Sequence, residues 1–392
     1  MDMHVQGARR ESKSIQDGED FVHTGPDTLA GRYLRRFWQP IHLSRDLKPG
    51  WSIAVRVLSE GLTLYRGETG TPFVVGHKCA HRGVQLSAGT VEGNDIRCPY
   101  HGWKYDGSGQ CIEQPSTPNS FADKVRIKSY PAVERLGMIF AYMGEGEPPA
   151  PPHYPLFENA EGVLQHMNVF YDHNYFHHLE NAIDEAHIPV LHKLSPYEQL
   201  SDEVPRISAE ETEYGLVQLG TRSSGAKRAT HFHMPNMTSW GQHPIYPEET
   251  AWRVWMGWRV PVDDYGHRTI GVMRAFMPAS AVPVFLEHRK KEFEGLAKFP
   301  PVNDVADAVL AGKMRWRDIQ MRGPGTDMTL IQDRVAMLGQ GVIADRVNER
   351  LGSNDVAIVL MRGIWRRELQ ALRDARPLKQ WAPSIPLATS GL

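Results

Sequence analysis

Two short stretches decide the fold of this chain: CAH at residues 79–81 and CPYHGW at residues 98–103, with sixteen residues between them. Each stretch places one cysteine two or three residues before one histidine. A Rieske 2Fe-2S cluster needs this set, because two thiolates bind one of its irons and two neutral imidazoles bind the other. The interleaved order lets each loop supply one ligand to each iron. The spacing therefore predicts a cluster held by Cys79, His81, Cys98 and His101.

A structural zinc site is the alternative for these four residues, since two cysteines and two histidines also suit Zn2+. Zinc fingers, however, pair cysteine with cysteine and histidine with histidine, whereas here each cysteine has a histidine beside it. Gly83 and Gly102 follow the histidines and allow both loops to turn tightly. The order of the ligands therefore favours the Rieske cluster over zinc.

The bulk composition excludes several classes of function. The chain has 392 residues, enough for two domains, and its formal charge of -2 gives no electrostatic reason to bind nucleic acid or a membrane surface. Residues 1–20 are polar and no apolar run is long enough to span a membrane, so we expect a cytoplasmic protein without a signal peptide. Of its three cysteines, two are assigned to the cluster and Cys111 is expected to be an ordinary buried thiol.

The order of local patterns predicts three parts: an N-terminal segment at 1–45, an all-β Rieske domain at 46–147 and a catalytic domain at 148–392. A helix capped by Asp27 or Thr28 is expected at 29–38. The Pro-rich stretch 144–152 is the predicted linker between the domains. Short strands separated by glycine turns are predicted at 53–58, 62–66, 73–76, 95–97, 102–105 and 138–141.

Beyond the linker the pattern changes to longer elements. Residues 252–260 alternate, with Trp255 and Arg259 on one face and Trp258 on the other, and 269–276 reads as the hairpin partner. Helices are predicted at 172–191, 302–319 and 333–376. The fold class expected is therefore α+β, an all-β Rieske domain followed by an antiparallel sheet covered by helices.

A second group of metal-binding residues lies in the predicted helix at 172–191. Asn181, Asp184 and His187 are spaced three apart, which places them near one face of a helix. His192 follows five residues later, and Pro189 between the two histidines disrupts the helix so that both imidazoles can reach one metal.

Two histidines need one carboxylate to complete the facial triad that holds non-haem Fe(II) with open positions. Asp333 is our candidate for this third ligand, and Asp345 and Asp355 remain as alternatives. The other histidines of this region are interpreted as structural: His166, His173, His177 and His178.

Together the two motifs resemble the large oxygenase component of the Rieske non-haem iron oxygenases, and the likeness covers residues 25–375. The stretches RYLRRFWQP at 32–40 and RCPYHGW at 97–103 look most like the phthalate 4,5-dioxygenase group, which includes O-demethylases and phenoxybenzoate-type enzymes. The resemblance implies that the four predicted ligands hold the cluster and that His187, His192 and Asp333 hold a mononuclear Fe(II). Gln332 departs from the family pattern, in which an acid often precedes the third ligand.

The resemblance also implies a working assembly. Members of the family form head-to-tail homotrimers, in which Asp184 would connect His101 of a neighbouring subunit to His187 of its own. The likeness to the phthalate dioxygenase group also implies a separate reductase carrying FMN and a plant-type 2Fe-2S cluster. This chain has no G-x-G-x-x-G motif, so we expect it to bind neither flavin nor nicotinamide itself.

The expected activity is hydroxylation of an aromatic, carboxylated substrate with O2. A carboxylate in an apolar site needs a fixed cation, for which Arg222, Arg253 and Arg259 are the candidates. Monooxygenation or O-demethylation of an aryl ether on the same scaffold is the first alternative. A Rieske electron-transfer protein without catalytic iron, and a hydrolase with zinc on the helical histidines, are the alternatives from other classes.

Overall fold

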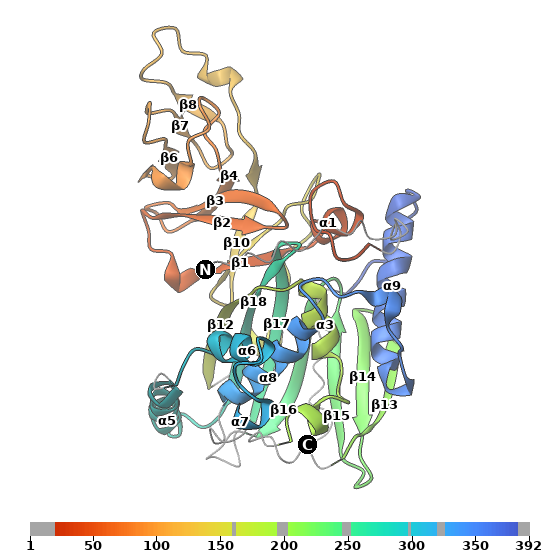
Figure 1. Ribbon diagram of the computed structural model, residues 1–392. Helices are drawn as coiled ribbons and strands as arrows, with labels where there is room; N and C mark the ends of the chain where they lie inside the picture. Colours follow the sequence, from red (N-terminus) through yellow and green to blue (C-terminus); the bar gives the residue numbers. More distant parts are fainter. Residues whose placement is uncertain are drawn as a thin grey trace.

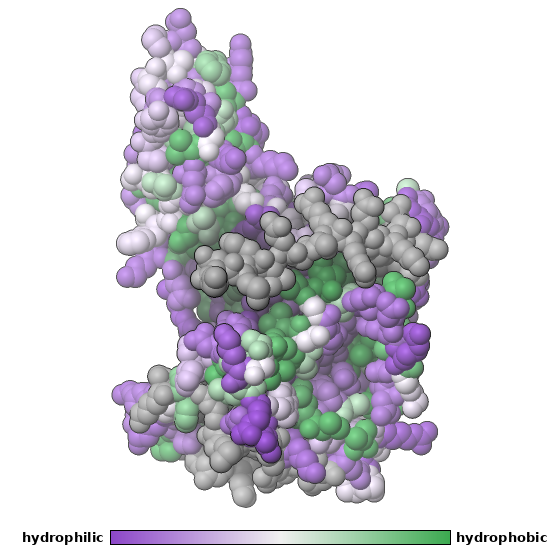
Figure 2. Space-filling model, viewed as in Figure 1, coloured by the Kyte–Doolittle hydropathy of each residue, from purple (hydrophilic) through white to green (hydrophobic). Residues whose placement is uncertain are grey.

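The protein consists of an upper β domain and a lower domain built on one large sheet (Figure 1). The computed structural model describes residues 20–158, 162–193, 203–244, 252–296, 299–319 and 326–382. Within these residues no helix is both long and apolar enough to cross a membrane. On the face drawn in Figure 2, hydrophilic residues outline both domains and apolar residues gather near the centre.

Two four-stranded antiparallel sheets form most of the upper domain. The strands predicted at 95–97 and 138–141 are confirmed residue for residue, and the other four shift by up to two residues at their ends. In sheet order the strands are β2 (Ser52–Val57), β3 (Glu60–Arg66), β4 (Pro72–Gly76) and β9 (Ser129–Tyr130), then β5 (Thr90–Glu92), β6 (Asp95–Arg97), β7 (Lys104–Tyr105) and β8 (Cys111–Glu113).

A third, three-stranded sheet lies at the base of the upper domain, next to the lower one (Figure 1). Its order is β1 (Gln39–Leu43), β11 (Met138–Ala141) and β10 (Ala132–Arg135). The N-terminal helix α1 (Leu29–Leu34) has Thr28 as its cap and ends before residue 38. The prediction overran because Pro40 disfavours helix at Gln39 and the chain extends there to pair with β11.

The lower domain is organised around a seven-stranded antiparallel sheet, which confirms the expected fold class. The hairpin predicted around residues 263–266 joins its two longest strands. The sheet order is β12 (Val163–Tyr171), β18 (Gly266–Phe276), β17 (Trp252–Asp263), β16 (Met237–Pro244), β15 (Lys227–His233), β14 (Gly215–Thr221) and β13 (Arg206–Glu211).

Both faces of this sheet are covered, as the burial of alternate residues in β17 shows. On one face Trp258 packs edge-on against Phe140 of β11, with ring centroids 5.5 Å apart. On the other face Arg259 is buried beside Thr269, its partner in the register, and Thr269 contacts His178 of the covering helix. The second face is therefore the one that the helices cover.

Several of the predicted helices are interrupted. The stretch 172–191 forms two helices with a turn at 183–187, where the Asp184 carboxylate accepts a hydrogen bond from the Ala186 N–H (2.9 Å) and Pro189 opens the second helix. The stretches 302–319 and 333–376 are likewise divided. The helices are α2 (Pro155–Glu158), α3 (Tyr175–Ala182), α4 (Ile188–Leu191), α5 (Val282–Leu296), α6 (Val302–Leu310), α7 (Trp316–Ile319), α8 (Thr326–Gly339) and α9 (Val356–Arg373).

Trp365 of α9 packs against aromatic residues of two other helices, α1 and α3. Its fully buried indole meets Tyr33 of α1 at 5.4 Å and Tyr175 and Phe176 of α3 at 6.4 and 5.7 Å between ring centroids. This cluster fixes the start of α3, the helix that leads to the predicted metal ligands.

Replacing Trp365 by alanine should lower the free energy of unfolding by about 3–5 kcal/mol, because it leaves a large cavity between α9, α1 and α3. Urea unfolding of the purified protein measures the change. Val359→Ala on the same helix is the matched control, since its side chain is 52% exposed and should change stability by less than about 0.5 kcal/mol. Equal stability of the two variants would contradict this role.

Candidate functional site

The two loops predicted to hold the cluster lie together in the upper domain. The Cys79 loop follows β4, and the Cys98 loop connects β6 to β7. Each closes on itself through a glycine: the Gly83 N–H donates to the Cys79 carbonyl (2.9 Å) and the Gly102 N–H to the Cys98 carbonyl (3.2 Å). Both glycines have φ near +70° (72° and 74°), a conformation that other residues rarely adopt.

The two thiols of these loops are buried and adjacent. Burial raises the pKa of the Cys98 thiol, and Cys79 raises it further, while the backbone N–H groups of Tyr100 and His101 act in the opposite direction. The Cys79 sulfur also contacts the Tyr105 hydroxyl at 3.3 Å. Two thiolates placed this close would repel one another unless a metal stabilised them, which fits a bound cluster.

The two imidazoles lie outside the thiols. The His81 ring is 4.5 Å from that of His101 and stacks on Trp103 at 4.7 Å with an interplanar angle of 7°. Inner sulfurs and outer imidazoles are the arrangement that a two-thiolate, two-imidazole cluster requires.

The second predicted group converges in the lower domain. Asp333 on α8 places Oδ1 3.1 Å from His192 Nε2 and 3.7 Å from His187 Nε2. Within the described ranges this is the group of three that could hold a metal ion, with all ligand atoms within 4.8 Å of one another. Ligand atoms about 2.1 Å from one metal lie roughly 3.0–3.4 Å apart. Small movements of these three side chains would therefore bring them all within binding distance of one metal ion.

The other ring nitrogens of both histidines face polar partners. His192 Nδ1 donates to the Gln332 amide oxygen at 2.9 Å, and His187 Nδ1 lies 3.6 Å from the Asp184 carboxylate. Burial by itself lowers the pKa of His187, but the carboxylates of Asp184 and Asp333 raise it above its ordinary value. These partners leave both Nε2 atoms directed at Asp333 and favour positive charge between them, as a metal site needs.

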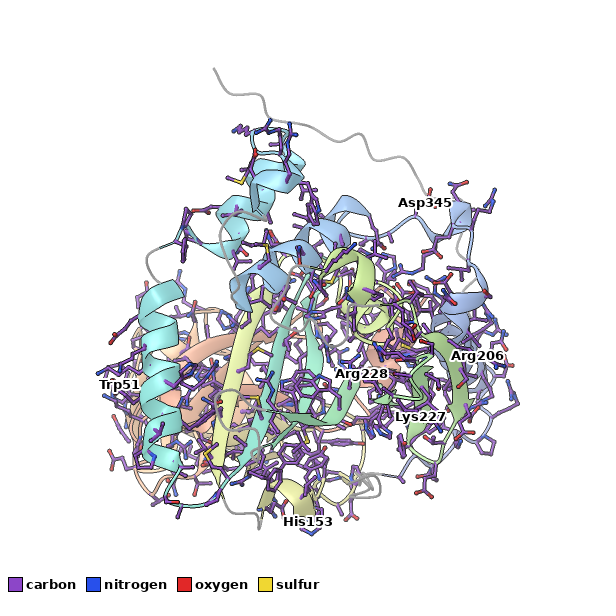
Figure 3. All side chains as sticks on the ribbon, turned by 90° about the horizontal axis from the view of Figure 1, so that it is seen from below. Trp51, His153, Arg206, Lys227, Arg228 and Asp345 are labelled. Atoms are coloured by element: carbon purple, nitrogen blue, oxygen red, sulfur yellow. The ribbon has the colours of Figure 1, made fainter. Side chains whose placement is uncertain are left out.

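The alternative carboxylates lie elsewhere. Asp345 caps a short turn by accepting from the Val347 N–H (3.2 Å), and it lies at the periphery in Figure 3. Asp355 accepts from the Gly352 N–H (2.6 Å). Because both are occupied as local caps, only Asp333 of the three candidates meets the histidines.

The remaining histidines of this region have structural surroundings. His166 bonds the Leu136 carbonyl at 2.7 Å and so joins β12 to the upper domain. Burial lowers the pKa of His173 to about 4 and of His177 to about 3, and it holds that of His178 well below its usual value. These rings are therefore neutral near pH 7.

Glu185, which the sequence did not single out, anchors the turn that carries His187. Its side chain is 0% exposed and accepts from Arg222 (3.0 Å), the residue just after β14, and from Arg228 (2.9 Å) on β15. A Cβ on Gly220 would lie 2.9 Å from the Glu185 carboxyl carbon, so the glycine makes room for it. The partners lie 37 and 43 residues away, and no local spacing signals such a contact.

The three arginines considered as substrate anchors differ in their surroundings. Arg222 pairs with Glu185, whereas Arg253 lies over the Trp240 ring (5.8 Å). Arg259 lies over the Trp255 ring (5.0 Å), and burial lowers its pKa to about 10.

Gln332→Leu should weaken the binding of a divalent metal to the His187, His192 and Asp333 group by about 10- to 100-fold, because His192 loses the acceptor that fixes its ring. Titration of the metal-depleted protein with Fe(II) or Co(II) measures the affinity. Gln340→Leu, an exposed position just after the same helix, is the control and should bind metal as the parent does. Unchanged affinity in Gln332→Leu would exclude this role.

The site can now be compared with known proteins. The sequence pattern of the Rieske 2Fe-2S domain matches residues 37–131. The chain is 31% identical to the oxygenase subunit of a tert-butanol monooxygenase / tert-amyl alcohol desaturase from Aquincola tertiaricarbonis, over 93% of this chain and 79% of that protein. It is 28% identical to the oxygenase subunit of 5,5'-dehydrodivanillate O-demethylase from a Sphingobium species, over 92% and 81% of the two chains.

Solved structures give the same fold. The carbazole-bound oxygenase in the ferredoxin complex of carbazole 1,9a-dioxygenase superposes with a TM-score of 0.63 at 21% identity, covering 90% of this chain and 92% of that one. The likeness extends through both domains.

Proposed function

Because the chain belongs to the large oxygenase subunits of the Rieske non-haem iron oxygenases, we propose that it uses O2 to hydroxylate an aromatic substrate at the His187, His192 and Asp333 group. The observation that carries this proposal is the convergence of two imidazoles and one carboxylate in a chain that also contains a Rieske domain. Cys79, His81, Cys98 and His101 would hold the cluster.

Cys79, His81, Cys98 and His101 would hold a Rieske cluster that would supply single electrons, and His187, His192 and Asp333 would hold an Fe(II) with positions left open for O2. The protein's own part is to fix the ligands. Gln332 accepts a hydrogen bond from His192, the Asp184 carboxylate lies 3.6 Å from His187 Nδ1, and the two Nε2 atoms face Asp333.

Electron delivery is proposed to cross a subunit interface. In one chain the loops around β6 and β7 lie at the far end of the upper domain, away from α3 and α8 (Figure 1). Asp184 keeps 25% of its side chain exposed and lies against His187, so it can accept a hydrogen bond from His101 of the partner subunit. A head-to-tail homotrimer would supply this contact at all three sites.

The electrons are proposed to come from a separate reductase, carrying FMN and a plant-type 2Fe-2S cluster. The related carbazole oxygenase has been solved with its ferredoxin, which supports a separate electron-transfer partner for this chain. If the substrate is carboxylated, Arg253 and Arg259, which lie over Trp240 and Trp255, are the candidate anchors, whereas Arg222 pairs with the buried Glu185.

Monooxygenation or O-demethylation is the second candidate, favoured by the two relatives of those activities. Turnover under 18O-labelled O2 with a reductase of a related system separates the two. Two labelled oxygens in one product indicate ring dihydroxylation, whereas one labelled oxygen, or formaldehyde with a new phenol, indicates monooxygenation or demethylation. Turnover that does not depend on O2 would overturn the whole proposal.

His187→Ala should lose the mononuclear iron but keep the red-brown colour of the cluster, because the two ligand sets lie in different domains. Metal analysis by mass spectrometry measures the total iron content, and the visible spectrum measures the cluster content separately. Loss of the cluster colour would contradict the division into two sites.

Asp184→Ala should keep both metals and still lose nearly all turnover, because the carboxylate touches His187 without being a ligand. Turnover with excess reductase, compared with metal content, gives the result. Glu203→Ala, an exposed carboxylate that accepts from Ser223, is the control. Parent-level turnover in Asp184→Ala would remove the carboxylate from the electron path.

A further inference from the structure

One row of side chains crosses the helix-covered face of the lower sheet. Gln218, Thr230, Trp240, Trp255 and Met273 are successive cross-strand partners from β14 to β18. Gln218 is 0% exposed and Thr230 is 1% exposed. Neither the amide nitrogen nor the amide oxygen of Gln218 has a hydrogen-bond partner among the described residues, and the same is true of the Thr230 hydroxyl.

This pair lies beside the turn that carries the metal ligands. The neighbouring pair on the same face is Gly220 and Arg228, and Glu185 lies against both. Glu185 stands two residues before His187. The turn that carries His187 therefore packs over the pair Gly220 and Arg228, which lies two residues along each strand from Gln218 and Thr230. Arg228 is labelled near the middle of Figure 3.

Leaving these atoms unpaired is unfavourable, since buried polar groups in native proteins nearly always have partners. Here three unpaired atoms meet on adjacent strands, because directly paired residues have Cβ atoms about 4.5–5.5 Å apart. A purely structural position would be filled better by leucine and valine. The set is instead suited to a ligand group that both donates and accepts hydrogen bonds.

The neighbours of the pair supply an apolar, aromatic wall. Trp240 and Trp255 stack with ring centroids 5.9 Å apart and an interplanar angle of 18°. The Trp255 indole lies over Gly257, where a Cβ would come within 2.3 Å of it. An aromatic ring held next to these indoles would place its substituents toward Gln218 and Thr230.

We propose that Gln218 and Thr230 form the subsite that recognises a neutral hydroxyl or carbonyl group on the substrate ring. The amide and hydroxyl carry no charge, and Arg222 and Arg228, the cations next to this pair along the chain, both pair with Glu185, whereas Arg253 and Arg259 lie over the indoles of Trp240 and Trp255. This inference rests on the proposed function, because it places the substrate beside the His187 turn.

The test measures binding to the holoenzyme with three matched probes: benzyl alcohol, benzamide and toluene. The parent protein should bind the first two more tightly than toluene, as followed by calorimetry and tryptophan fluorescence. Gln218→Leu should lower the affinity for benzyl alcohol and benzamide by about 10-fold or more and leave the affinity for toluene unchanged. Thr230→Val should change these affinities in the same direction. Thr221→Val, on the opposite face of β14, is the matched control.

Thermal unfolding distinguishes recognition from a structural role. Gln218→Leu should keep or raise the Tm of the ligand-free protein, because it removes unpaired buried polar atoms. A lower Tm with unchanged probe affinity would overturn the proposal, as would equal binding of toluene and benzamide to the parent protein. If the parent shows O2-dependent turnover and the variants bind the probes as the parent does, only the subsite is rejected. If the parent discriminates between the probes but shows no O2-dependent turnover, the oxygenase proposal is rejected.

Discussion

The buried ion pairs of Glu185 are the interaction on which the lower domain's site depends. A buried carboxylate is tolerable only when cations compensate it, and Arg222, just after β14, and Arg228, on the adjacent β15, do so. Glu185 follows Asp184 directly and precedes His187 by two residues. Its pairing therefore holds the turn at 183–187 against the sheet, while Asp333 approaches from α8 on the other side.

The two groups that are proposed to bind metal are built in different ways because their elements differ. In the upper domain, short strands and glycine turns hold Cys79, His81, Cys98 and His101 within two compact loops. In the lower domain the ligands come from an interrupted helix and from a distant helix, and polar partners fix each ring. A partly accessible Asp184 beside His187 suits the proposed delivery of electrons from outside this domain.

Local patterns predicted the elements better than their ends. The strands around the cluster and the β17–β18 hairpin were found from alternation and turn residues, because these signals extend over a few neighbours. The helix expected through residue 38 ends at Leu34, since pairing with β11 extends the chain that follows it. The helices expected at 302–319 and 333–376 are each divided, because caps and tight turns interrupt a pattern that looks continuous in the sequence.

The sequence by itself determined the chemistry of the ligands: the interleaved cysteines and histidines, and the break at Pro189 that brings His192 back toward His187. Only the tertiary structure decided that Asp333 meets these histidines while Asp345 and Asp355 cap local turns. It also decided that Gln332 accepts from His192 and that Gln218 and Thr230 have no hydrogen-bond partner within the part of the chain that the structure describes. The reason is physical: ligands close in sequence are placed by short-range backbone geometry, whereas these contacts depend on how the helices pack against a seven-stranded sheet.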